Sequence, residues 1–188
     1  RLRLGLVLQF LADYKPDILC LQEIKCQNDQ FPAKDFTAAG YPYQAVHGQK
    51  GYHGVAIISR FPLTDISSRV FCAIEESRHV SARVDFGRGP LTVHNFYIPA
   101  GGDEPDPEIN WKFKHKLDFL AEMKTWFGDG SAAAAADILV GVADAIGVRD
   151  VSAILVGADV TPVSGSGTAQ LADGIRKAQP RWSAGARW

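Results

Sequence analysis

The sequence predicts a mixed α/β domain in which short, mostly antiparallel strands lie beside amphipathic helices. Three observations support this fold class. Short apolar runs bounded by turn residues recur along the first half of the chain, as in buried strands. Two longer segments repeat apolar residues at helical spacing. With 188 residues, of which 46% are hydrophobic and 22% charged, the chain has the size and composition of one soluble globular domain.

The amino-terminal part begins with a helix. Apolar residues recur every three or four positions over residues 4–14, and Lys15-Pro16 ends the pattern. Residues 18–21 are a short apolar run that predicts a buried strand. Residues 36–39 predict the end of a short helix with Gly40 just beyond it, and residues 43–47 predict an extended segment.

The next part of the chain reads as neighbouring, antiparallel strands. The last two of them are separated by a hairpin-like break at Gly87-Arg88-Gly89-Pro90. Residues 99–110, PAGGDEPDPEIN, form a loop by composition. The strands are expected at 55–59, 65–71, 80–86 and 91–98. After the loop we expect a helix with an apolar face made of Ile109, Phe113, Leu117, Leu120 and Phe127.

The composition changes after Phe127. Residues 128–188 contain no Glu, Asn, His, Cys, Met, Phe or Tyr and begin with GDGSAAAAAD. We therefore expect a partial domain over 1–127 and an Ala/Gly-rich tail over 128–188. Within the tail, 137–141 and 153–157 predict short buried strands, and 168–177 predicts a weak helix. The tail is rich in Ala, Gly, Val, Asp and Arg, a composition that GC-rich DNA gives in many reading frames. A shifted reading frame or a joined fragment would explain it, and the alternative is a natural segment that replaces the second half of the domain.

Bulk properties exclude several classes of protein. No stretch approaches the roughly 18 consecutive apolar residues of a membrane span, and none resembles a signal peptide. We therefore expect a cytoplasmic protein that binds no membrane. Three cysteines without a CxxC spacing predict neither a disulfide framework nor a zinc site, and Cys20 is expected in the core. The net charge of −1 neither supports nor excludes nucleic acid as a ligand.

Two segments carry candidate site residues. In DILCLQEIKC, Glu23 follows the predicted strand at 18–21. An acid there either ends the strand in solvent or serves a site, because strand ends in α/β layers are rigid and open onto crevices. In GQKGYHG, Lys50 and the glycine amides suit a phosphate group. A plain hairpin with a solvated lysine explains that turn equally well. Position alone therefore does not decide whether Glu23 serves a site or whether this turn binds phosphate.

Several separate motifs resemble one enzyme family. LQEIK, HGQKGYHGVAIIS, RHVSARVDF and NFYIPAGG occur in the order found in the bacterial exodeoxyribonuclease III family of the endonuclease/exonuclease/phosphatase superfamily. The resemblance covers residues 1–127. It implies that the chain encodes part of an α/β sandwich, in which two mixed, mostly antiparallel sheets are flanked by helices and the site opens where strand ends meet.

The resemblance also implies residue roles. Glu23 matches the metal-binding glutamate of the L-Q-E-x-K motif, and the implied ion is Mg²⁺ or Mn²⁺, which takes carboxylate and phosphate oxygens. Tyr97 matches the active-site tyrosine and is the catalytic candidate, although a tyrosine after a strand is otherwise a core residue with a solvated hydroxyl. Arg78 matches an arginine near the DNA backbone, and Lys50 is expected to bind DNA phosphates.

Other parts of the family's site have no match. The strand with a W-N or F-N motif is not among these residues. The G-D-x-N and S-D-H motifs cannot occur after residue 127, because no Asn follows Asn110 and no His follows His115. His53 and His79 receive no role, since a lone histidine beside a strand is more often structural.

The resemblance implies a Mg²⁺-dependent hydrolase of DNA phosphodiesters, a 3′–5′ exonuclease and abasic-site endonuclease of base-excision repair. Its expected partner is duplex DNA with abasic sites or 3′ ends, and we expect a monomer. Because groups that act as a unit lose most of the rate when one is removed, the polypeptide as written is expected to be inactive or nearly so. Two alternatives are a non-catalytic DNA-binding or interaction protein and a hydrolase of lipid or inositol phosphates. The repair-type motifs argue against the latter.

Overall fold

The computed structural model describes residues 3–85, 90–128, 137–143 and 155–156. The chain divides after Ala158, and every described residue lies in the first part, Arg1–Ala158. The described helices are α1 (Leu4–Tyr14), the 3₁₀ turn Asn28–Gln30, α2 (Ala33–Ala38) and α3 (Trp111–Gly128). The described strands are β1 (Ile18–Gln22), β2 (Tyr43–His47), β3 (Val55–Ser59), β4 (Leu63–Ser67), β5 (His79–Asp85), β6 (Pro90–Ile98), β7 (Asp137–Ala143) and β8 (Leu155–Val156).

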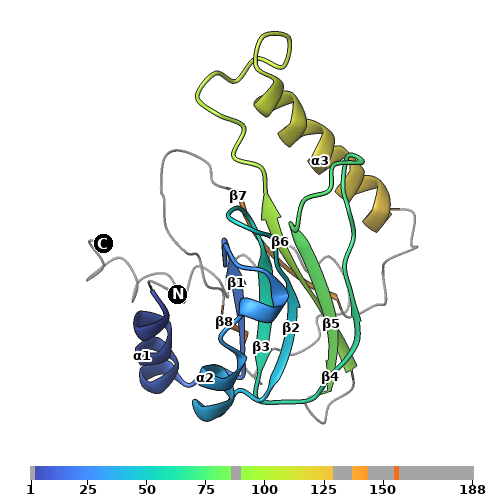
Figure 1. The fold of residues 1–188 in the computed structure, drawn as a ribbon. Coiled ribbons are helices and arrows are strands. Elements are labelled where there is room, and N and C mark those ends of the chain that lie inside the picture. Colours follow the sequence, from blue (N-terminus) through green and yellow to red (C-terminus); the bar gives the residue numbers. More distant parts are fainter. Residues whose placement is uncertain (1–2, 86–89, 129–136, 144–154, 157–188) are drawn as a thin grey trace. The chain divides into compact units, whose positions relative to one another are not determined.

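These strands form two sheets (Figure 1). The first sheet has the order β2-β3-β1-β8, and its pairings are antiparallel. The second has the order β4-β5-β6-β7, antiparallel except for the parallel pair β6 and β7. The predicted class of mixed, mostly antiparallel sheets with helices is therefore confirmed. The short strands predicted at 137–141 and 153–157 are β7 and β8, and each pairs with a strand of the first 127 residues.

The boundary proposed after Phe127 stays a prediction, as does the origin of the residues beyond it. The weak helix predicted at 168–177 lies outside the described residues. Gly40 follows α2 with φ +92°, the left-handed conformation expected just after a helix end. Among the described residues, no helix is both long enough and apolar enough to cross a membrane.

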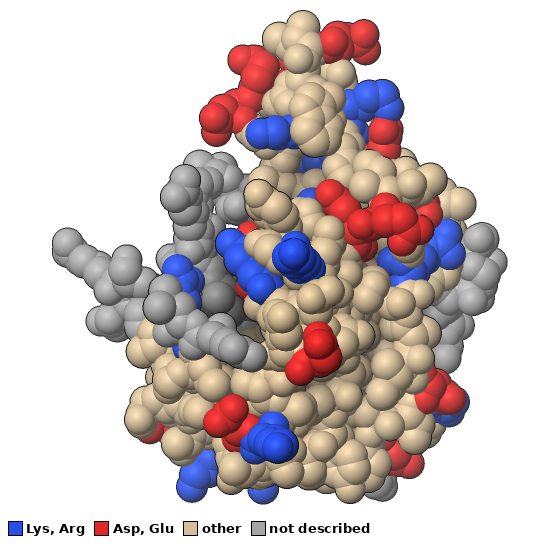
Figure 2. All heavy atoms as spheres, in the orientation of Figure 1, with Lys and Arg blue, Asp and Glu red and all other residues tan. Residues whose placement is uncertain are grey.

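Charged side chains of both signs are spread over the surface of the described residues. Figure 2 shows acidic and basic groups close to one another on the face that it draws, without a field of one sign covering that face. This distribution agrees with the net charge of −1.

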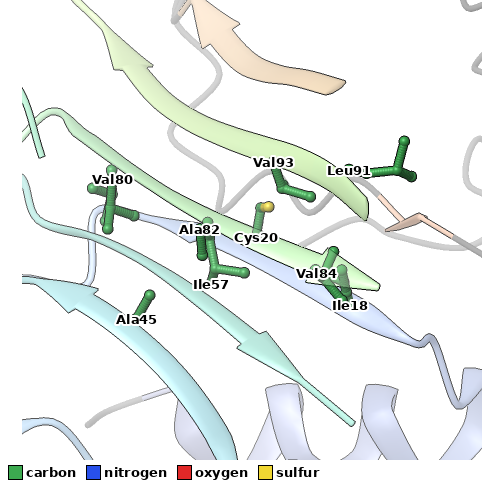
Figure 3. Packing of buried hydrophobic residues seen from close by; sticks show 10 residues of the cluster. Ile18, Cys20, Ala45, Ile57, Val80, Ala82, Val84, Leu91 and Val93 are labelled. Atoms are coloured by element: carbon green, nitrogen blue, oxygen red, sulfur yellow. The ribbon is translucent and has the colours of Figure 1, made fainter. Parts of the chain in front are cut away.

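The core lies between the two sheets and on their outer faces. Cys20 and Ile57 of the first sheet lie opposite Ala82 and Val93 of the second, all of them buried (Figure 3). The alternate residues of the first sheet, such as Leu19, pack instead with helices α1 and α2. This alternation follows from the two-residue period of a strand. Cys20 is in the core as predicted, and burial raises the pKa of its thiol to about 12.

The apolar face predicted for α3 is largely wrong, although its last residue, Phe127, packs against the buried cluster beside this helix. The buried row of α3 instead begins at Phe119, which is fully buried, and continues through Met123 and Trp126. These positions follow the i, i+4, i+7 spacing, so the helix is rotated by about one residue from the predicted face. The apolar residues of the predicted face that are exposed are Ile109 (74%), Leu117 (42%) and Leu120 (39%). The sequence of this helix contains more than one apolar row. Contact with Phe96 of β6 and with Phe71, in the segment between β4 and β5, decides which row is buried.

The strand predicted at 65–71 is displaced. The observed strand is β4, Leu63–Ser67, and its register against β5 shifts between Thr64 and Ser67. β4 lies at the edge of the second sheet, and four of its five residues are exposed. An exposed edge strand has no apolar alternation from which its ends can be predicted.

Candidate active site

The candidate site lies where the carboxyl ends of β1 and β6 meet. Between the sheets, apolar packing gives way there to a buried amide pair, Gln22 and Asn95. Gln22 Nε2 donates to Asn95 Oδ1 (2.6 Å), and Asn95 Nδ2 donates to the carbonyl oxygens of Leu21 and Ala56, both at 2.9 Å. Asn95 therefore joins β6 to β1 and β3 close to Glu23, which follows the last residue of β1, and Tyr97, two residues further along β6.

The side chains of Glu23 and Tyr97 meet at this point. Tyr97 Oη donates a hydrogen bond of 2.6 Å to Glu23 Oε1, joining residues 74 positions apart. The Glu23 side chain is 38% exposed, and the Lys25 ammonium lies 3.3 Å from Glu23 Oε2. Partial burial raises the pKa of Glu23, but the Tyr97 hydrogen bond and Lys25 outweigh it and leave the pKa below its ordinary value. Glu23 is therefore an ionised carboxylate at neutral pH.

The backbone around Glu23 is in an uncommon conformation. Glu23 (φ +53°) and His53 (φ +49°) both adopt the left-handed region, which costs an L-residue about 1 kcal/mol or more. Two hydrogen bonds hold them there: Ile24 N–H donates to Gly54 O (3.2 Å), and Lys25 N–H donates to His53 O (3.0 Å). At Gly54 (φ +85°) a Cβ would lie 2.6 Å from Ile24 Cγ1, so this close approach requires glycine.

A second group of charged side chains adjoins Tyr97. Arg78 is 9% exposed and is ion-paired through Nε with Glu76 Oε2. Arg78 Nη1 also donates to Tyr97 O (3.1 Å), and its guanidinium carbon lies 5.1 Å from the centre of the Tyr97 ring. His53 lies on the other side of Glu76, with Nε2 3.3 Å from Glu76 Oε1 and 3.4 Å from Arg78 Nη2.

Burial and the neighbouring charges set the ionisation of this group. Burial and Arg78 lower the pKa of His53, and the opposing effect of Glu76 is smaller, so the imidazole is neutral near pH 7. Burial raises the pKa of Glu76, but Arg78 outweighs it and holds that pKa below its ordinary value. A neutral His53 uses Nε2 either to donate to Glu76 or to accept from Arg78.

Of the four residues singled out in the sequence, three lie together. Glu23, Tyr97 and Arg78 form one connected cluster. Lys50 lies on the turn between β2 and β3, and its side chain is exposed. The turn is anchored to the segment before Arg78, because Ser77 N–H donates to Gln49 Oε1 (2.9 Å) and the Ser77 hydroxyl donates to Gly48 O (3.2 Å).

The oxygen donors at this site suit a hard divalent cation in part. Glu23 offers an ionised, accessible carboxylate, and Mg²⁺ is often held by one or two carboxylates together with waters and phosphate oxygens. Gln22 Oε1, directly beside it, is buried and has no hydrogen-bond partner among the described residues, so it can accept from a water molecule. No three His, Cys, Asp or Glu side chains of the described residues lie close enough to hold a metal by themselves.

Sequence reasoning missed Glu76, His53, Gln22 and Asn95. Gln22 carried a signal, because a polar residue in an otherwise apolar strand needs a buried partner. Glu76 stands two residues before Arg78 in EESR, a spacing that permits an ion pair but does not require one. His53 and Asn95 showed no signal, since their neighbours come from distant parts of the chain. His79, also given no role, is fully buried and packs on Phe96, which fits a structural residue.

Comparisons with known proteins agree with this fold. The sequence model of the endonuclease/exonuclease/phosphatase family matches residues 1–159 and so extends past Phe127. The chain is 33% identical over 119 residues to exodeoxyribonuclease III of Haemophilus influenzae, covering 62% of this chain and 43% of that protein.

Solved structures show the same likeness. The 3′ phosphatase NExo from Neisseria, bound to a product DNA hairpin, superposes with a TM-score of 0.62 at 30% identity, covering 77% of this chain and 53% of that one. An AP endonuclease from Archaeoglobus fulgidus gives a TM-score of 0.62 at 30% identity, covering 74% and 51%. The chain thus spans about half the length of these relatives.

Proposed function

This chain belongs to the endonuclease/exonuclease/phosphatase family, and on that premise we propose that it forms part of a divalent-metal-dependent hydrolase of DNA phosphodiesters. The specific reactions proposed are 3′–5′ exonuclease action on duplex DNA and incision at abasic sites. Its relatives include an exodeoxyribonuclease III and an AP endonuclease, which support this substrate class. The single observation that carries the proposal is the hydrogen bond from Tyr97 Oη to Glu23 Oε1.

Each residue of the cluster has a proposed task. Glu23 provides the carboxylate for Mg²⁺ or Mn²⁺, and Tyr97 fixes that carboxylate while presenting its hydroxyl beside the substrate phosphate. When bound, the metal would polarise the phosphodiester and offset charge on the leaving oxygen. Lys50, exposed on its turn, and Arg78 are the proposed cations for the DNA backbone, where phosphate contacts position the duplex without reading its sequence.

Turnover is a separate part of the proposal. Hydrolysis also needs a group that activates water in line with the leaving oxygen. Within these 188 residues no Asn follows Asn110 and no His follows His115, so the residues that the family resemblance assigns to this task are not among them. The 188-residue polypeptide is therefore proposed to bind metal and DNA with little or no turnover. This is also the observation that favours the second candidate, a non-catalytic DNA-binding protein.

The test combines binding with turnover. Mn²⁺ affinity and affinity for a duplex with one abasic site would be measured at low salt, where phosphate contacts are strongest. Nicking of the same duplex would be followed with Mg²⁺. The variant is Glu23→Gln, which keeps shape and removes charge. The matched control is Glu75→Gln, the same change at an exposed residue next to the cluster.

We expect the wild-type chain to bind both ligands, with Mn²⁺ affinity reduced at least about tenfold by Glu23→Gln and unchanged by Glu75→Gln. Nicking is expected to stay at background. If neither Mn²⁺ nor DNA binds the wild-type chain, the proposed function is wrong. If nicking occurs and Glu23→Gln abolishes it, the hydrolase assignment holds and the absence of turnover is refuted.

A further inference from the structure

Glu76 occupies the centre of the charged cluster beside Tyr97. One of its carboxylate oxygens is paired with Arg78 Nε, and the other lies 3.3 Å from His53 Nε2. The Glu76 side chain is itself 22% exposed, whereas that of Arg78 is only 11% exposed. An arginine so nearly enclosed needs an anionic partner, because withdrawing a guanidinium from water without one is strongly unfavourable.

Arg78 uses each of its three side-chain nitrogens within the protein, which leaves N–H groups for the proposed contact with the DNA backbone. The guanidinium has five N–H groups, and in this cluster Nε faces Glu76, Nη1 donates to Tyr97 O, and Nη2 lies beside His53. Its planar group is also within cation–π distance of the Tyr97 ring. Arg78 therefore holds both the backbone and the ring of Tyr97.

Backbone hydrogen bonds also fix Arg78 and Tyr97 relative to each other. Tyr97 N–H donates to Arg78 O (2.7 Å), so the two residues are linked in both directions. Gly54 N–H donates to Ser77 O (2.9 Å), which ties the same segment to the residue after His53. The Tyr97 ring adjoins both side chains, with its centre 5.1 Å from the Arg78 guanidinium carbon and 5.8 Å from the centre of the His53 ring. Movement of Arg78 would therefore release the Tyr97 ring on one side.

We propose that Glu76 is a positioning residue, which keeps Arg78 against Tyr97 so that the Tyr97 hydroxyl stays on the Glu23 carboxylate. This inference rests on the proposed function of Glu23 and Tyr97. Glu76 acts on them through its ion pair with Arg78. Without the Glu76 charge, Arg78 turns toward solvent, the Tyr97 ring gains rotational freedom, and Glu23 loses the donor that fixes its orientation.

The experiment follows Tyr97 itself. All five tyrosines would be replaced by 3-fluorotyrosine, and the ¹⁹F resonance of Tyr97 identified by its loss in Tyr97→Phe. The test variant is Glu76→Gln, and Glu75→Gln is the matched control, with the same charge change at an exposed neighbour. Mn²⁺ affinity and the midpoint of urea unfolding would be measured for each protein.

We expect Glu76→Gln to shift or broaden the Tyr97 resonance and to weaken Mn²⁺ binding about tenfold, as for other residues that orient a metal ligand. Glu75→Gln is expected to change neither. An unmoved Tyr97 resonance in folded Glu76→Gln overturns the inference, because a purely structural role alters only the unfolding midpoint.

Two further results keep the test decisive. If Glu76→Gln does not fold, Arg78→Lys replaces it, since lysine keeps the charge but lacks the planar fork. The same shift of the Tyr97 resonance is then expected, and its absence again overturns the inference. If the wild-type chain binds no Mn²⁺, the proposed function fails, while the Tyr97 resonance still reports whether Glu76 positions that ring.

Discussion

His79 gives the structure a predictable dependence of stability on pH. It is fully buried at the start of β5, and its ring centre lies 4.5 Å from that of Phe96. Arg69 N–H donates to its Nδ1 (3.1 Å), so the neutral ring carries its proton on Nε2 and donates to His94 Nδ1 (3.1 Å). Burial, followed by the charges of His94, His47 and Arg69, lowers the pKa of His79 to about 3.

The size of the effect follows from proton linkage. An unfolded histidine has a pKa of about 6.5, so between this value and about pH 3 the unfolded chain binds a proton that the folded chain excludes. The free energy of unfolding therefore rises with pH across this range, and the contribution is complete above pH 6.5. At about 1.4 kcal/mol per pH unit, the fall from pH 6.5 to pH 5 removes about 2 kcal/mol of stability.

The assay compares wild type with His79→Gln, which retains a donor and an acceptor but does not titrate. Urea unfolding would be measured at about pH 7 and about pH 5, above the range in which carboxylates titrate. His53 and His115 also have lowered pKa values, but they are present in both proteins and cancel in the comparison. We expect the pH dependence to be about 2 kcal/mol smaller in the variant. If the change in the free energy of unfolding between the two pH values differs by less than about 0.5 kcal/mol between wild type and the variant, this reasoning is refuted.

Two further predictions concern the framework below the site. Asn95→Ala removes three buried hydrogen bonds and leaves the amide of Gln22 unpaired, so we expect the free energy of unfolding to fall by about 2–4 kcal/mol in urea titrations. A loss below about 0.5 kcal/mol would show that water replaces those partners. Gly54→Ala brings a methyl group against Ile24 in a left-handed conformation, so it should lower the thermal midpoint by several degrees, about 2 kcal/mol or more. An unchanged midpoint would show that the backbone relaxes at no cost.

Much of the fold was predictable because burial leaves a local period in the sequence. The helix at 4–14 and the strands at 18–21, 43–47 and 55–59 agree with the observed α1, β1, β2 and β3 to within a residue or so. The predictions were wrong where the apolar period is weak, or where more than one row of apolar residues fits the same helix. β4 is an exposed edge strand, and α3 has more than one apolar row, so contacts with the second sheet decide which row is buried.

The site was predictable only through resemblance. Glu23, Tyr97 and Arg78 were singled out because their motifs match a family, and the structure brings these three side chains together. Glu76 and His53 belong to the same cluster but were not assigned to it. Both stand in loop segments before strands, where no apolar pattern reveals what a side chain faces.

The sequence by itself determined the types of the main elements and the family, and through the family resemblance it singled out Glu23, Tyr97 and Arg78 as candidate site residues. Only the tertiary structure shows that Tyr97 donates a hydrogen bond to Glu23, 74 residues away in the sequence, and that Glu76 forms an ion pair with Arg78 beside them. The physical reason is that local periodicity records whether a residue is buried, whereas a contact between distant strand ends depends on sheet register and on how the two sheets pack.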